Sequence, residues 1–138
     1  MSVAEDAGWL DTNIFVHART RDDRSAACRR LLGRLASGES MGRIDPVVVH
    51  ELTYALPHVF PMGKLEVADY IKTVLTWESI DAVGGKEPLI VALTPWAEHG
   101  ISFVDALLAA RALQDGTMVS TENVKDIIKV GALATRPG

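Results

Sequence analysis

Residues 102–120, SFVDALLAARALQDGTMVS, decide the fold class, because a helical pattern is followed directly by a short apolar strand. The apolar spacing predicts a helix from Ser102 to Leu113 that stops at Gly116. Met118-Val119-Ser120 then has the length of a short strand. Similar alternations of strand and helix recur along the sequence, and this order predicts an α/β fold.

The other elements follow from the same patterns. Strands are predicted near Gly8–Leu10, at Met41–Ile44, within Trp77–Val83 and around Ala132–Ala134; helices are predicted over 22–37, 64–76, 87–99 and within 123–136. A further helix should have Asp45 as its N-cap and Pro46 at its first position, and run through Val47 to about Val59. Thr94-Pro95 should kink or restart the helix over 87–99. Strands separated by helices imply one short central parallel sheet flanked by helices, and the length of 138 residues implies a single domain over residues 1–138.

The charge and composition of the chain limit its possible functions. With 18 acidic and 14 basic side chains, the net charge of −4 argues against nucleic-acid binding by bulk charge. The segment from Arg19 to Arg43 is nevertheless locally +4, with seven arginines against three acids. A single cysteine and the lack of a signal-peptide or membrane-spanning pattern predict a cytoplasmic protein. The three tryptophans, Trp9, Trp77 and Trp96, are expected in the core.

Two acidic residues stand at unusual positions in apolar elements. Asp11 directly follows the first predicted strand, where parallel sheets build their sites, although Asp is also a favoured helix N-cap. Glu51 interrupts the apolar helix after Val47-Val48-Val49. It either faces a metal, a base or a cleft, or it lies at a helix edge and reaches solvent.

Two further acids lie in the C-terminal part of the sequence. Asp105 has the S-x-x-D capping-box spacing from Ser102, which is compatible with a second role for its carboxylate. Asn123 and Asp126 follow the last predicted strand, where such residues are ordinary in turns. A parallel sheet can gather these distant carboxylates at one edge, and carboxylate oxygens suit Mg²⁺ or Mn²⁺.

Four stretches together resemble the motifs of PIN-domain ribonucleases, and most closely the VapC-type toxins of type II toxin–antitoxin modules. They are LDTN (10–13), VVHEL (48–52), GISFVDALLAA (100–110) and STENVKDI (120–127). Their order and spacing cover nearly the whole chain. The resemblance implies a single PIN-like α/β domain that hydrolyses RNA phosphodiester bonds as an Mg²⁺-dependent, or Mn²⁺-dependent, endoribonuclease.

The resemblance also implies roles for individual residues. Asp11 and Asp105 correspond to the most direct metal ligands and Glu51 to the third acid, while Asp126 completes the predicted catalytic set. Either Asp126 or Asn123 fills the fourth site position, because some members of the family have Asp where this chain has Asn123. Asn13, Thr121 and Asn123 are expected to hydrogen-bond the carboxylates or the substrate. The implied partners are RNA, a VapB-like antitoxin and a second copy in a homodimer, with no membrane.

A catalytically silent PIN-like module that acts only through a protein partner is the alternative function. The distances between the three acidic side chains distinguish the two functions. A single metal ion requires Asp11, Glu51 and Asp105 to converge, since bonds from oxygen to a divalent cation are only about 2.0–2.6 Å long.

Overall fold

The computed structural model describes residues 3–138 of the chain. Its elements, in chain order, are β1 (Glu5–Trp9), α1 (Thr12–His17), α2 (Ser25–Ser37), β2 (Ser40–Ile44), α3 (Pro46–Val59), α4 (Lys64–Thr76), β3 (Ile80–Ala82), α5 (Glu87–His99), α6 (Phe103–Asp115), β4 (Met118–Ser120), α7 (Val124–Val130) and β5 (Leu133–Thr135). Strands alternate with helices, and every strand pair is parallel. The predicted α/β class is confirmed.

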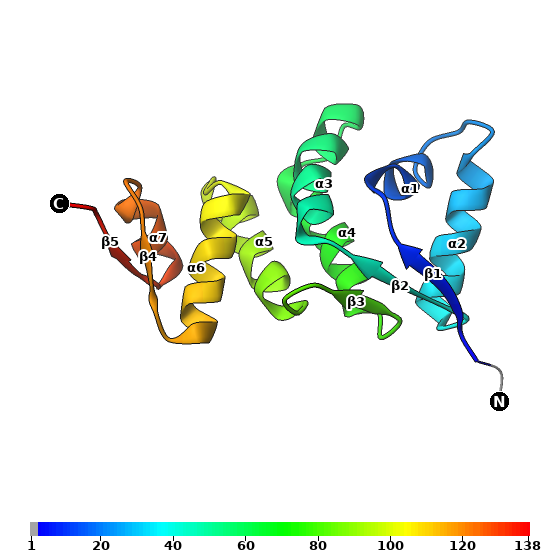
Figure 1. The fold of residues 1–138 in the computed structure, drawn as a ribbon. Coiled ribbons are helices and arrows are strands. Elements are labelled where there is room, and N and C mark those ends of the chain that lie inside the picture. Colours follow the sequence, from blue (N-terminus) through cyan, green and yellow to red (C-terminus); the bar gives the residue numbers. More distant parts are fainter. Residues whose placement is uncertain (1–2) are drawn as a thin grey trace.

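The strands are divided between two sheets. The first sheet has the order β1-β2-β3, and the second contains β4 and β5. Figure 1 shows an elongated molecule in which α5 and α6 lie between the two sheets. The parallel arrangement predicted from the sequence is therefore present, but within residues 3–138 it is split rather than gathered into one central sheet.

The hydrophobic core is divided in the same way. The larger cluster is built on side chains such as Phe15, Leu56 and Leu93, all fully buried, and it extends to Phe103 and Ala106 at the start of α6. The smaller cluster contains only Ala109, Ala112, Val119, Ile127 and Ala132. The helix α6 thus belongs to both clusters, and it joins the C-terminal strands to the rest of the molecule.

The predicted helix boundaries hold well where capping signals are present. Asp45 accepts a hydrogen bond from the Val47 amide at 2.9 Å, and α3 begins at Pro46 as the Asp-Pro pair indicates. The helix α2 begins three residues later than expected. Asp22 accepts a hydrogen bond from the Arg24 amide (2.8 Å), and this local turn competes with the first helical turn.

Two other expectations are corrected by the structure. Of the kink or restart expected at Pro95, the restart is absent: α5 is one helix from Glu87 to His99, with Pro95 and its neighbour Trp96 buried, and tertiary packing holds the helix together. Trp9 is not a core residue, since 60% of its surface is exposed, whereas Trp96 is buried as expected. Over the described part of the chain, no helix is long and apolar enough to span a membrane.

Candidate active site

Asn123 joins two of the predicted acidic residues. Its side-chain Nδ2 donates hydrogen bonds to Asp105 Oδ2 at 3.0 Å and to Asp126 Oδ2 at 2.7 Å. Its backbone amide donates to Thr121 Oγ1 at 2.9 Å, which fixes the turn that follows β4. The structure therefore brings together four residues of the predicted site, Thr121, Asn123, Asp105 and Asp126.

Helix capping explains the position of Asp105. Ser102 Oγ accepts a hydrogen bond from the Asp105 backbone amide at 3.2 Å, which places the residue in the first turn of α6. The Asp105 carboxylate is bonded by Asn123 instead of closing a capping box. The backbone of Asp105 thus takes part in capping the helix, while its side chain takes part in the cluster. The two roles considered for this residue are compatible.

Asp11 and Asp45 follow neighbouring parallel strands, but their carboxylates are used differently. Asp45 caps α3 through its side chain. Asp11 occupies the N-cap position of α1 with extended backbone angles, yet its side chain makes no capping hydrogen bond. Asp11 and the nearby Asn13 are both exposed, and the Asp11 carboxylate is not engaged in capping the helix.

Glu51 lies on the exposed face of α3. Val49 and Leu52 are buried, whereas His50 and Glu51 between them are exposed, so these two residues form the outward side of the turn. His50, the residue before Glu51, stacks against Phe103, with ring centroids 6.0 Å apart. This contact links α3 to the first turn of α6, which also contains Asp105.

The predicted acids occupy separate parts of the molecule. Asp11 lies between β1 and α1, whereas Asp105 and Asp126 lie in α6 and α7, and Figure 1 shows these two regions well apart. Within residues 3–138 of this single chain, no group of three or more His, Cys, Asp or Glu side chains is placed to hold a metal ion. One chain thus presents Asp105 and Asp126 as a pair, with Asp11 in a separate region.

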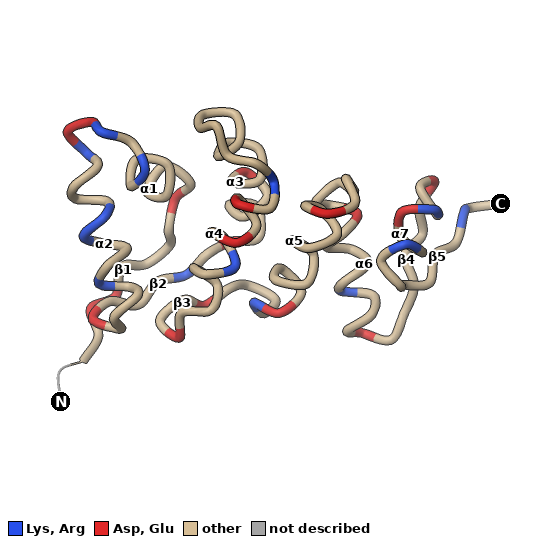
Figure 2. Tube along the Cα trace, turned by 180° about the vertical axis from the view of Figure 1, so that it is seen from behind, with Lys and Arg blue, Asp and Glu red and all other residues tan. Residues whose placement is uncertain are grey.

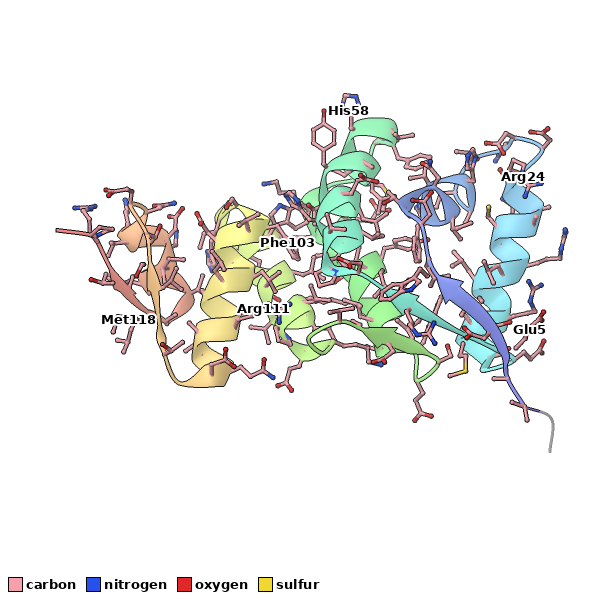
Figure 3. All side chains as sticks on the ribbon, in the orientation of Figure 1. Glu5, Arg24, His58, Phe103, Arg111 and Met118 are labelled. Carbon is pink, nitrogen blue, oxygen red and sulfur yellow. The ribbon has the colours of Figure 1, made fainter. Side chains whose placement is uncertain are left out.

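The basic segment lies at the end of the molecule opposite the C-terminal strands. Figure 2 shows Lys and Arg positions along α2 and the loop that precedes it, and Figure 3 places Arg24 and Met118 at opposite ends. Part of this charge has contacts within the chain, because Arg19 lies over the Tyr70 ring (5.0 Å) and Arg43 pairs with Asp6 at 3.5 Å. The exposed arginines are thus nearer to Asp11 in the fold than to Asp105.

A polar network in the loop between α1 and α2 was not recognised in the sequence. Asp22 Oδ2 accepts hydrogen bonds from Thr20 Oγ1 at 2.6 Å and lies 2.9 Å from His17 Nδ1. The hydrogen bonds to Thr20 and His17 hold the pKa of the Asp22 carboxyl well below its usual range. The signal available in the sequence was the short-range turn chemistry of an Asp two residues after Thr20.

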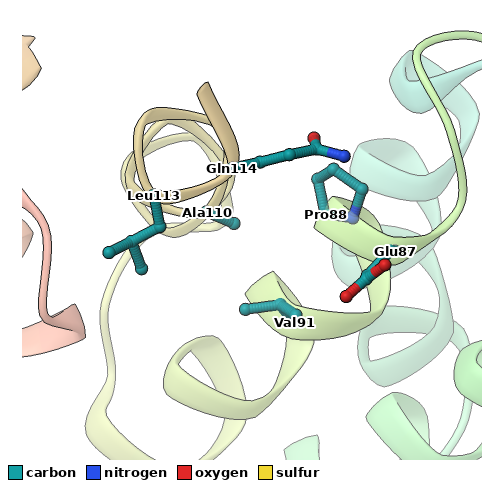
Figure 4. Close-up of a pocket in the computed structure, with 6 residues that line it drawn as sticks. All are labelled: Glu87, Pro88, Val91, Ala110, Leu113 and Gln114. Atoms are coloured by element: carbon teal, nitrogen blue, oxygen red, sulfur yellow. The ribbon is translucent and has the colours of Figure 1, made fainter. Parts of the chain in front are cut away.

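Cavities elsewhere have a different character. Figure 4 shows a cavity of about 300 Å³ between α5 and α6, lined by Glu87, Pro88, Val91, Ala110, Leu113 and Gln114. Glu87 is its only carboxylate, and none of the predicted site residues lines it. The candidate site is therefore defined by the Asp105–Asn123–Asp126 cluster and not by this cavity.

Comparisons with known proteins place these residues in a family. No curated protein matches the chain. A solved structure described as VapBC2 from Rickettsia felis bound to a DNA fragment from their promoter is similar at 20% identity and a TM-score of 0.37, over 95% of this chain and 98% of that chain. The family model described as PIN domain matches residues 9–131, a stretch that includes every predicted site residue. PIN domains are generally nucleases that use divalent metal ions. By this match over most of its length, the chain belongs to the PIN domain family.

Proposed function

We propose that this protein is a metal-dependent endoribonuclease of the VapC type, and that it acts as the toxin of a toxin–antitoxin module. The main observation that supports this proposal is the cluster in which Asn123 donates hydrogen bonds to the carboxylates of Asp105 and Asp126. The chain that contains the cluster belongs to a family of proteins that are generally nucleases. The motif resemblance of residues 10–13, 48–52, 100–110 and 120–127 supports the finer assignment to VapC-type toxins.

The donor chemistry of the cluster fits a hard divalent cation. Asp105 and Asp126 each have a carboxylate oxygen besides the one bonded by Asn123, and the Asn123 amide adds a neutral oxygen. Oxygen donors of this kind suit Mg²⁺ or Mn²⁺. When bound, such an ion polarises a phosphate and lowers the pKa of a coordinated water. In our proposal Asp11, Asp105 and Glu51 hold the ion, and Asp126 completes the catalytic set. Because Asp11 lies in a separate region of one chain, it has to reach Asp105 of another copy.

The remaining residues orient and support these ligands. Asn123 keeps the two carboxylates at a fixed separation through its two N–H donors, and Thr121 fixes the backbone of Asn123. Asn13 is placed next to Asp11, where it can bond that carboxylate or the substrate. The exposed arginines of α2 and the preceding loop supply positive charge for an RNA backbone.

The proposal includes partners and a compartment. The substrate is RNA, the protein partner is a VapB-like antitoxin, and the active unit is a homodimer of a single-domain chain. The acidic cluster and the basic segment offer the substrate and the antitoxin surfaces of both charges. The single buried cysteine, Cys28, is compatible with the reducing cytoplasm in which we place the protein.

Cleavage of total cellular RNA, with and without Mg²⁺ or Mn²⁺, tests the proposal, and mapping of the cut ends identifies the target. We expect cleavage that requires the metal and that is abolished by Asp105→Asn or Asp11→Ala while the fold persists. Growth arrest on expression should be lost in the same two variants. Asp69→Asn is the matched control, because Asp69 is an exposed acid on α4, and it should cleave like the unmodified protein.

Each result distinguishes the nuclease from the alternative function. Full activity of Asp11→Ala or Asp105→Asn would remove the proposed metal role. A well-folded protein that binds a partner but never cuts RNA under either metal would instead support the catalytically silent binding module.

A further inference from the structure

The strand β4 borders a groove that is suited to another strand. A groove of about 320 Å³ is lined by all three residues of β4 and by Leu108 and Ala112 of α6. Among the described residues β4 is paired with β5 alone, so its second edge is free there. Met118 on this strand is 52% exposed. Parallel sheets are normally larger and covered on both faces, which makes this two-stranded sheet an incomplete one.

The strand β1 is the matching element at the other side of the molecule. It is the outermost strand of its parallel sheet, with β2 on one edge and, among residues 3–138, no strand on the other. Apart from its two chain neighbours, no described residue has an atom within 4 Å of the position that a Cβ would take at Gly8, so the strand is uncovered there. Trp9 adds a large apolar side chain that is 60% exposed. A free edge with exposed apolar residues favours pairing with another strand.

An apolar cleft extends the groove. A second cavity of about 220 Å³ between α3 and α6 shares Leu108 and Arg111 with the groove beside β4. Its wall includes Val47 and Val104, which are 64% and 49% exposed. The two hollows together offer apolar surface alongside the free edge of β4, and a strand that carries a side chain such as Trp9 would cover it.

We propose that β1 of a second copy of this chain pairs in parallel with the free edge of β4, reciprocally, so that two chains form two five-stranded sheets of order β3-β2-β1-β4-β5. Within one chain α5 and α6 lie between β1 and β4 (Figure 1), so a second copy supplies the missing strand without disturbing the packing of α5 on α6. Every copy presents both edges, so a two-fold axis between two copies pairs both edges of each and closes the exchange at a dimer.

The exchange completes the acidic site, and this part of the inference rests on the proposed function. Parallel pairing places the carboxyl ends of β1 and β4 side by side. Asp11 follows β1, while Thr121 and Asn123 follow β4. Asp11 of one copy thus reaches the Asp105–Asn123–Asp126 cluster of the other, together with the basic segment from Arg19 to Arg43. Neither copy forms the site alone.

Proline substitution at the free edge tests the interface without relying on activity. Thr121 N–H donates to Thr135 O at 2.9 Å, and backbone amides alternate in direction along a strand. The Ser120 amide therefore points to the free edge of β4, and the Ala134 amide points to the outer edge of β5. Neither proline removes a hydrogen bond between β4 and β5, but only Ser120→Pro removes a donor from the proposed interface.

The readout is molar mass by light scattering, with circular dichroism as the control for folding. We expect a dimer for the unmodified protein and for Ala134→Pro, and a folded monomer for Ser120→Pro. A monomeric unmodified protein would overturn the proposal. So would a Ser120→Pro variant that is folded and still dimeric, since the copies would then associate elsewhere.

Complementation between two inactive variants tests the shared site. In a mixed dimer of Asp11→Asn and Asp105→Asn chains, refolded together, one of the two sites has both native residues. Random mixing in equal amounts makes half of the dimers mixed, so about one quarter of the unmodified activity should return. No recovery, with an active unmodified protein, would mean that each site lies within one chain.

The two proposals fail in different ways. If the unmodified protein does not cleave RNA, the proposed function is wrong, while the molar masses of the proline variants still decide the strand exchange. If it cleaves RNA as a monomer, the function stands and the exchange is wrong.

Discussion

The substitution Asn123→Asp tests whether Asn123 stands where a cation belongs. In the structure its Nδ2 lies 3.0 Å from Asp105 Oδ2 and 2.7 Å from Asp126 Oδ2. The substitution replaces a donor shared by two carboxylates with a third carboxylate. Without metal, both hydrogen bonds are lost and two like-charge contacts replace them, so we expect the variant to be less stable than the unmodified protein.

The magnitude follows from the distances and the exposure. Two unit charges about 4 Å apart repel by about 1 kcal/mol in bulk water, and Asn123 is exposed, so the two new contacts together cost about 2 kcal/mol. For a domain of this size, that loss lowers the melting temperature by roughly 6–10 °C. Mg²⁺ should reverse it, because the variant has three carboxylates to coordinate the ion and the unmodified cluster has two.

The assay is thermal unfolding at low ionic strength, with EDTA or with millimolar Mg²⁺, since salt screens exposed charges. Gln114→Glu is the matched control, because Gln114 is an exposed amide on α6 that lies outside the candidate site. The reasoning is refuted if Asn123→Asp and the unmodified protein have the same melting temperature in EDTA. It is also refuted if Mg²⁺ raises the melting temperatures of Asn123→Asp and of the unmodified protein by the same amount.

Three further outcomes follow from single residues. Leu93→Ala removes a fully buried side chain and should lower the free energy of unfolding by about 2–5 kcal/mol, measured by urea denaturation. Asp45→Ala removes the cap on the Val47 amide and should cost about 1 kcal/mol in the same assay, so an unchanged urea midpoint would contradict the capping role. Burial raises the pKa of the Tyr70 phenol, partly offset by the Arg19 guanidinium, so stability should fall as the pH rises from about 10 towards the folded value. In an ultraviolet titration of the phenol groups, the ionisation step at the higher pH should disappear in Tyr70→Phe and persist in Tyr54→Phe. If that step persists in both variants, it does not belong to Tyr70.

Local signals predicted most of the elements. The Asp45-Pro46 pair marks the start of α3, and the expected boundaries of α4 and β4 are those observed. Capping and strand length act between near neighbours in the sequence, so they can be read from it. The unbroken α5 could not be predicted in this way, because burial of Pro95 and Trp96 against other elements overrides the local effect of proline.

The candidate site shows a similar division. Asp105, Asn123 and Asp126 were selected from their positions at element ends, and the structure joins them by hydrogen bonds. Their distance from Asp11 could not be inferred, because the pairing of β1 depends on contacts between residues far apart in the sequence. The exposure of Trp9 has the same origin, since a strand's environment depends on which strand lies beside it.

The smaller hydrophobic cluster has a consequence for the dynamics of the site. Three of its five members are alanines, so it buries little apolar surface compared with the cluster around Leu93. Regions with few buried apolar contacts open at a lower free energy than the whole protein. Amide protons of α7 and of β4 should therefore exchange with solvent before those of α3 and α4. Ligands that hold Asp105 and Asp126 together would slow that exchange, which links occupancy of the cluster to the order of the C-terminal quarter of the chain.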